Sequence, residues 1–293
     1  MNVKHLALSV LAAGGLFALA PAVPATAEPA LWKVTGSHAI VYLFGTVHLL
    51  KPATQWRSPK IEAAFASAST LWEEIANADD AAAAQSIVAQ LGLDPAHPLS
   101  AQLDDPLRAK LSAFEAAYNL PPGQIDALRP WLAALQFQAL PERTAGYDPK
   151  SGVELTLKAA AAAQGKPTMG FETLEQQMHF FADLPQKLQI DFLSFTLDAT
   201  GQTVARTGDI VDAWAAGDVD KLGSLVDNAA LFKRYPALYR TLVVDRNRAF
   251  ADKIEQMLKG NGVSFVAVGA GHFVGQDSVQ ADLAKDGIIA VRQ

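Results

Sequence analysis

The sequence contains no cysteine among its 293 residues. This absence excludes disulfide bonds, thiolate metal ligands and a cysteine nucleophile. A metal site in this chain would therefore have to use histidine, carboxylate and water. Such donors suit zinc, manganese, cobalt or iron better than Cu(I), which prefers sulfur.

An excess of positive charge is also missing. The chain has 24 Lys and Arg residues against 30 Asp and Glu residues, a net charge of -6. No nucleic-acid partner is expected, because such partners bind basic surfaces. The sequence has neither the Gly-x-Ser-x-Gly elbow of serine hydrolases nor a glycine-rich nucleotide-binding loop. The composition, 50% hydrophobic and 18% charged, is that of a globular protein.

Long apolar runs are absent after the first 27 residues. The chain begins with Lys4, an apolar run over 6–20, two prolines and the small-x-small pattern at 25–27. This pattern predicts a signal peptide over 1–27 and a mature chain, 28–293, exported to the periplasm. The alternative is an uncleaved anchor, although the run is short for a bilayer span. No stable membrane span is expected after cleavage.

Two stretches far apart in the chain, 40–48 and 265–272, are apolar runs that each end in Gly-x-x-His. Each run predicts a buried strand, and the glycine would let the backbone turn off the strand end. His48 and His272 would then stand just past the strand ends, where open α/β sheets bind their ligands. The pair predicts one shared crevice, whereas either motif alone is as compatible with a simple turn.

Strand patterns occur near both ends of the chain, and helical patterns fill the middle. Strands are predicted at 31–35, 39–45, 70–75, 168–171, 265–268 and 288–291, with helices over 59–68, within 79–163, within 174–259 and at 278–285. This order predicts a single α/β domain. Its central mixed β-sheet is built from both chain ends and covered by helices, and it carries a large helical insert.

Several charged residues lie beside these strands. Glu73 and Glu74 end the strand at 70–75 and, by alternation, face opposite sides of the sheet. Glu172 precedes Thr173, a candidate helix N-cap, so it either joins a site or supports the helix start. Arg246 and Arg248 are two positions apart on one helix and must point to different sides.

The ordered set of motifs resembles the TraB/GumN family. The segments are Leu-Phe-Gly-Thr-Val-His at 43–48, Leu-Trp-Glu-Glu-Ile at 71–75, Gly-Phe-Glu-Thr-Leu-Glu-Gln-Gln at 170–177, Arg-Asn-Arg at 246–248 and Gly-Ala-Gly-His-Phe-Val-Gly at 269–275. They span nearly the whole chain after residue 27. The family is related to the TIKI metalloproteases, and more loosely to haem-binding ChaN and to erythromycin esterases.

The resemblance implies a metal-dependent hydrolase. Carried over by position, His48, His272 and Glu74 form the metal site, with Glu73 as the alternative acid. Glu172 matches the family's Glu-Thr motif, and Arg57 lies at a spacing similar to that of an arginine in the esterase relatives. Catalytic roles are therefore assigned to all of these residues except Glu73.

Two imidazoles and one carboxylate can form an open metal site that leaves room for water. The expected metal is manganese, cobalt or zinc, and the expected substrate is a peptide or a small ester. A second carboxylate could act as general base. The alternative function is a periplasmic protein that binds a metal or haem through the same histidines without catalysis. Glu74 discriminates between the two, because haem ligation needs no such acid.

Overall fold

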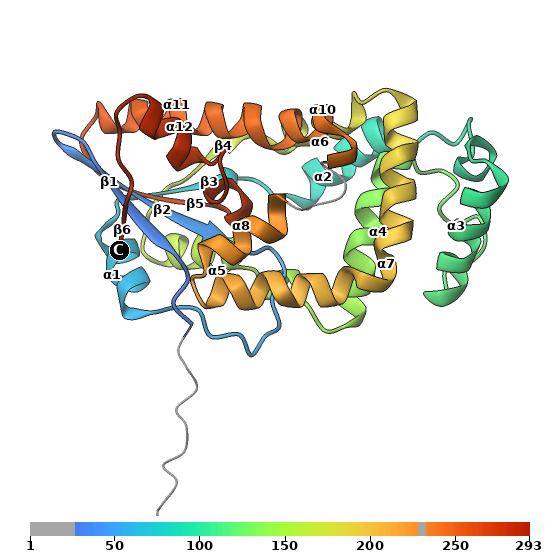
Figure 1. Cartoon of the computed structure of the whole chain (residues 1–293), viewed down its shortest axis with the longest axis horizontal. Coiled ribbons are helices and arrows are strands. Elements are labelled where there is room, and N and C mark those ends of the chain that lie inside the picture. The colour runs from blue at the N-terminus through green and yellow to red at the C-terminus, as the bar shows by residue number, and fades with distance from the viewer. Residues whose placement is uncertain (1–26, 228–232) are drawn as a thin grey trace, which may run out of the picture.

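The computed structural model describes residues 27–227 and 233–293. Of the predicted signal peptide, all but Ala27 lies outside the described residues. The described chain forms a mixed six-stranded sheet with helices on both faces and a helical lobe at one end (Figure 1). The predicted fold class is confirmed.

The sheet has the order β4-β3-β5-β2-β1-β6. Its strands are β1 (Leu31–Thr35), β2 (Ala39–Thr46), β3 (Thr70–Ile75), β4 (Thr168–Glu172), β5 (Gly262–Gly269) and β6 (Val291–Arg292). β4, β3, β5 and β2 run parallel, and β1 is antiparallel to both β2 and β6. β5, from the end of the chain, therefore lies between two strands from its beginning, as predicted.

The last strand differs from its prediction at 288–291. β6 covers only Val291 and Arg292, which pair with Lys33 and Trp32. The backbone N–H of Ile288 instead donates to the carbonyl of Leu283, which closes the end of the preceding helix. The hydrophobic run begins in the helix cap, so only its last part reaches the sheet.

Five of the described helices begin at a residue whose side chain caps the helix. Ser58 accepts from the backbone of Ile61, and Thr173 forms a capping box with Gln176, as the N-cap predictions require. The helices are α1 (Pro59–Ser67), α2 (Ala81–Ile87), α3 (Asp105–Ala117), α4 (Pro130–Thr144), α5 (Val153–Ala163), α6 (Leu174–Ala182), α7 (Gln186–Ala215), α8 (Val219–Asp227), α10 (Pro236–Tyr239), α11 (Asp245–Leu258) and α12 (Val279–Lys285). Short 3-10 or π segments join several of them.

One of these π segments, Arg240–Val244, changes a prediction. The amphipathic pattern favours a single helix over 239–258, but the α-helix proper starts at Asp245, after the π turn. Arg246 follows directly, and its guanidinium donates to the carbonyl of Leu242 within the π segment at 3.1 Å. A local widening of the helix thus lies next to a buried cation, a common place for π turns.

Separate apolar clusters hold the layers together. α1, α5 and the end of α7 pack on one face of the sheet, and α11 and α12 pack on the other. α3, α4 and the first half of α7 form a third cluster in the helical lobe. α7 therefore joins the lobe to the sheet, where its Trp214 indole donates to the carbonyl of Gly45 at 2.7 Å.

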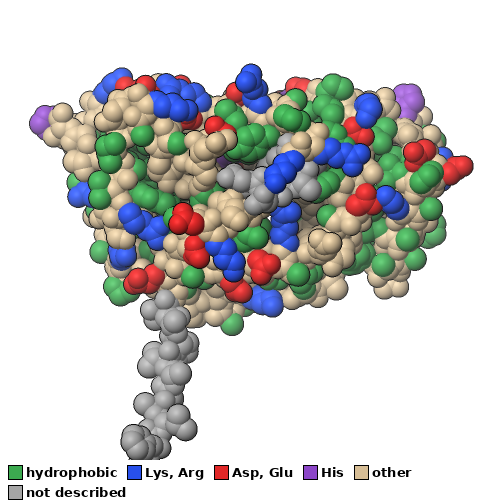
Figure 2. Space-filling view, in the orientation of Figure 1, with side chains coloured by type: hydrophobic (Ala, Val, Ile, Leu, Met, Phe, Trp, Pro, Cys, Tyr) green, Lys and Arg blue, Asp and Glu red, His purple; other side chains and the backbone are tan. Residues whose placement is uncertain are grey.

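Charges of both signs are interspersed on the face shown in Figure 2. Within the described residues, no helix combines the length and the apolar character that crossing a membrane requires.

Candidate active site

The carboxyl ends of the four parallel strands meet at one edge of the sheet. His48 follows β2, Glu74 stands near the end of β3, Glu172 ends β4 and His272 follows β5. β2 and β5 are direct neighbours, with Thr46 opposite Gly269. The sheet thus brings four of the five predicted catalytic residues to one edge, the place where open α/β sheets bind ligands.

Gly269 marks the point where these side chains converge. A Cβ atom built on this glycine would lie 2.9 Å from Glu74 Oε1, 3.8 Å from His48 Nε2 and 3.7 Å from His272 Cδ2. Both imidazoles and the carboxylate therefore border the same small volume. Any side chain at position 269 would fill it.

The motif glycines serve a different purpose from the predicted turn. Neither Gly45 nor Gly269 has the positive φ that favours glycine. A Cβ on Gly45 would instead come within 2.9 Å of the Ala270 backbone. The two Gly-x-x-His motifs use glycine to let their segments approach each other closely, not to reverse the chain.

Each histidine is held through Nδ1. His48 Nδ1 lies 2.7 Å from Glu154 Oε1, and His272 Nδ1 contacts Asn247 Oδ1. The amide of Asn247 donates to the carbonyl of Asp277, so its oxygen faces His272 and accepts from the ring. With both Nδ1 atoms engaged, each ring turns Nε2 towards the Gly269 volume. Metal-binding histidines are commonly fixed in this way.

Glu74 has a full set of partners. It accepts from the Gly269 N–H at 2.8 Å, from Arg246 at 2.9 Å and from Gln177 at 3.2 Å, and its Oε1 lies 3.3 Å from His272 Nε2. Burial alone would raise the pKa of Glu74, but His272, Arg246 and His48 outweigh it and hold that pKa well below its usual range. The group is an anion in the folded protein.

Glu172 belongs to the site through Arg246. Both carboxylate oxygens accept from the guanidinium, at 2.7 and 2.9 Å. Thr173 and Gln176 cap the next helix, so Glu172 is not needed there. Arg246 thus bridges Glu74 and Glu172, whereas Arg248 points away and pairs with Asp252 and Asp286. The two arginines face different sides, as their spacing predicts.

Arg57 lies outside this cluster. Its guanidinium pairs with Glu62, five residues along the chain, and sits over the Trp56 ring. It does not line the pocket beside His48. The structure therefore does not bring Arg57 together with the other predicted site residues.

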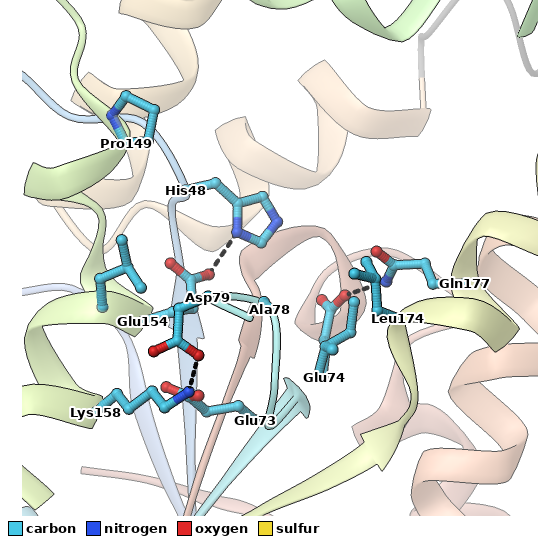
Figure 3. A pocket seen from close by; sticks show the side chains of 12 residues that line it. His48, Glu73, Glu74, Ala78, Asp79, Pro149, Glu154, Lys158, Leu174 and Gln177 are labelled. Carbon is cyan, nitrogen blue, oxygen red and sulfur yellow. Dashed lines mark hydrogen bonds and ion pairs between the residues drawn. The ribbon is translucent and has the colours of Figure 1, made fainter. Parts of the chain in front are cut away.

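A pocket of about 320 Å³ opens beside His48 and Glu74 (Figure 3). On one side lie Glu74 and Gln177. On the other side gather Glu73, Asp79 and Glu154 with the ammonium of Lys158. The His48 side chain is 67% exposed, so solvent and ligands reach it.

Some site residues had no clear signal in the sequence. Glu154 stands in the first turn of α5, where acids are common for helix stability alone. It raises the pKa of His48 to about 9 by its negative charge and its hydrogen bond, against the opposing effect of burial. Gln177 and Asn247 lie within the motif segments 170–177 and 246–248. Both are uncharged, and nothing in the sequence distinguishes them as site residues beside their charged neighbours.

The donor set fits a divalent metal in chemistry and orientation. Two Nε2 atoms and one anionic oxygen face a common volume, and both rings are held by second partners. Among the described residues, however, no group of three or more His, Asp or Glu side chains lies close enough together to hold a metal ion.

The comparisons with known proteins cover nearly the whole described chain. A family model described as the TraB/PrgY/gumN family matches residues 30–292. The chain is similar to an uncharacterized protein of Treponema pallidum (strain Nichols), with 24% identity over 269 residues, covering 86% of this chain and 79% of that protein. No solved structure matches at a significant level. The family match confirms the resemblance drawn from the motifs.

Proposed function

The chain belongs to the TraB/PrgY/gumN family, and we propose that it is an exported metal-dependent hydrolase acting on a peptide or a small ester. One observation carries this proposal: His48, His272 and Glu74 border the same volume above Gly269. They do so at the carboxyl edge of the sheet and beside an open pocket. Family membership alone assigns no reaction, so the proposal rests on these side chains.

His48, His272 and Glu74 would hold the metal, which we propose to be manganese, cobalt or zinc. When bound, such an ion supplies a water of lowered pKa, about 7, and a Lewis acid for a carbonyl oxygen. The protein supplies two neutral nitrogen donors and one anionic oxygen. Because Glu154 favours the protonated form of His48, metal binding there must displace a proton.

The remaining residues orient the ligands. Asn247 fixes the ring of His272, and Glu154 fixes that of His48. Arg246 holds the Glu74 carboxylate in place, and Glu172 holds Arg246. Because both oxygens of Glu172 are occupied by Arg246, we assign Glu172 a positioning role instead of that of a general base.

The pocket limits what can be cleaved. Its volume of about 320 Å³ lies at the lower end of small-molecule sites and admits one side chain and the bond next to it. Its walls are largely apolar, with Ile75, Leu155 and Leu174 around the acidic groups. A short segment of peptide or a small ester fits this space.

The export proposal has two supporting observations. Glu28, the first residue after the predicted cleavage site, donates its backbone N–H to the carbonyl of Ala215 and so ties the start of the proposed mature chain to the end of α7. The family match begins at residue 30. N-terminal sequencing of periplasmic protein should give Glu28 as the first residue. A full-length N-terminus in the membrane fraction would favour the anchor instead.

The hydrolase proposal is tested by metal analysis and peptide cleavage. The purified protein should carry manganese, cobalt or zinc by mass spectrometry and cleave members of a peptide library or simple esters. His48→Ala, His272→Ala and Glu74→Gln should each reduce metal affinity and hydrolysis by more than about 100-fold, because they remove direct ligands. His97→Ala is the matched control, since His97 is an exposed loop histidine paired with Asp94.

Two results would remove the proposal. One is a wild-type protein that binds none of these metals and gains no activity from any of them. The other is haem binding that depends on His48 or His272, with no hydrolysis, which would establish the non-catalytic binding protein.

A further inference from the structure

The proposed mechanism leaves two acids of the pocket without a task, Glu73 and Asp79, and of these Asp79 is paired with Lys158. Glu73 is only 3% exposed, and it lines the cavity beside His48. Its Oε1 atom is buried and has no hydrogen-bond partner among the described residues. A buried carboxylate oxygen without a donor is costly, so its presence beside a cavity points to a ligand that supplies the donor.

The neighbouring acids have partners of their own. Asp79 pairs with Lys158, whose ammonium also donates to the carbonyl of Ala76 at 2.6 Å. Glu154 pairs with His48 and accepts from the hydroxyl of Thr46. Lys158 is therefore already engaged by two acceptors. On this side of the pocket Glu73 has no contacting cation among the described residues.

The lining around Glu73 suits a charged group on an apolar stem. Ile75, Leu155 and Leu174 contribute apolar wall, and Glu73 lies with Asp79 and Glu154 on one side of the pocket (Figure 3). Long cationic side chains bind in this way, with their methylene groups on apolar surface and the charged end on an acid. Glu73 thus favours a cation over an anion or a purely apolar group.

We infer that Glu73 anchors a subsite for an ammonium group carried by the peptide substrate, an inference that rests on the proposed peptidase function. Although the side chains of Glu73 and Glu74 leave β3 on opposite faces, both line the same pocket as His48. A substrate cation held by Glu73 therefore brings its own peptide backbone next to Glu74 and His48. Glu73 is in this sense a specificity residue, and it takes no part in bond breaking.

Binding of small probes tests the subsite without any need for hydrolysis. The probes are Nα-acetyl-lysine amide and Nα-acetyl-norleucine amide, which share the four-carbon stem and differ in the ammonium group. In a nuclear magnetic resonance titration of the metal-free protein, the lysine probe should bind about tenfold more tightly, the ratio expected for one charge-assisted hydrogen bond. Glu73→Gln should remove this preference. The matched charge control is Glu255→Gln on the surface of α11, which should keep it.

A second pair of probes shows whether the ammonium group belongs to the peptide N-terminus or to a side chain. Alanine amide carries a free α-ammonium, and Nα-acetyl-alanine amide does not. A Glu73-dependent preference for alanine amide, with none for the lysine probe, assigns the subsite to the peptide N-terminus. A preference for the lysine probe assigns it to a side chain.

Two outcomes overturn the inference. The first is equal binding within each probe pair by the wild-type protein, a result that does not depend on any variant. The second is an ammonium preference that survives Glu73→Gln. Failure of the hydrolase proposal has a different signature, because ammonium binding would then persist in a protein that cleaves no peptide or ester with any metal.

Discussion

Glu73 and Glu74 are adjacent in the sequence and have opposite surroundings. Glu74 accepts from a backbone N–H, from Arg246 and from Gln177, and cationic neighbours hold its pKa well below the usual range. Burial, reinforced by Glu154 and Asp79, raises the pKa of Glu73 to about 8. One residue along β3 separates an anion with hydrogen bonds to both oxygens from an acid that keeps its proton at neutral pH unless a bound cation ionises it.

The difference comes from distant segments. The alternation of the strand turns the two side chains to opposite faces, and each face meets different parts of the chain. Glu74 meets β5 and the start of α11, which supply a backbone donor and a guanidinium. Glu73 meets the α5 side of the pocket, which supplies more negative charge than positive. Pairs of acids with opposed pKa shifts are typical of active sites.

The largest effect is expected from removing the cation that distinguishes Glu74. Arg246→Met leaves two buried carboxylates, Glu74 and Glu172, without their shared partner, and should reduce the free energy of unfolding by about 3 to 5 kcal/mol. Urea denaturation measures this change. Because the lowered pKa of Glu74 stabilises the fold above the unfolded-state value, the loss should shrink as pH falls and Glu74 becomes protonated. Arg248→Met, exposed and two residues away, should cost far less.

Replacing Glu73 should change the free energy of unfolding in the opposite direction. A carboxyl group whose pKa is raised by folding destabilises the protein as pH rises from its unfolded value towards about 8. Glu73→Gln removes this effect, so it should increase the free energy of unfolding by on the order of 2 kcal/mol at pH 9, with little change at pH 4. Thermal or urea unfolding of the wild-type protein and Glu73→Gln at pH 4 and pH 9 measures this difference. Destabilisation at pH 9 would show that Glu73 is ionised and well solvated.

Glu154 acts on two groups of the pocket, because its charge raises the pKa of His48 and that of Glu73. In Glu154→Gln, the pKa of His48 should fall from about 9 towards the ordinary value of about 6.5, a change visible in the imidazole proton resonances. Metal binding near pH 7 should then release less than one proton from this residue. Glu62→Gln, on the surface pair with Arg57, should leave the titration of His48 unchanged.

The smallest effect is expected outside the cluster. Arg57→Ala removes a surface pair and should change the free energy of unfolding by less than about 0.5 kcal/mol, with metal content and hydrolysis unaltered. Metal analysis and a cleavage assay check this directly. A large loss of hydrolysis would place Arg57 in contact with the substrate in the working protein.

The sequence predicts the strands and the histidines well because their signals are local. An apolar run ending in Gly-x-x-His is visible within ten residues, and the two runs lie in neighbouring parallel strands, as expected. The partners of the histidines are not visible in this way. Glu154 and Asn247 reach the site from α5 and α11, and only tertiary packing decides that these polar residues, among many on helices, turn inwards.

The role of the two motif glycines could not be predicted from local sequence either. The sequence indicates that Gly45 and Gly269 are special, but a turn and a close approach give the same pattern of residues. The structure distinguishes them, because a Cβ at either position would meet atoms of another segment. The identity of those atoms depends on the pairing of β2 with β5, which no local pattern contains.

The place of β5 in the sheet also determines when the protein can fold. β5 comes late in the chain and fills the gap between β2 and β3, so before residue 269 is available both early strands have an unpaired edge. Such edges are prone to association with other chains, and long-range strand pairing is slow. During synthesis, closure of the sheet and completion of the site must therefore both wait until β5 has been made.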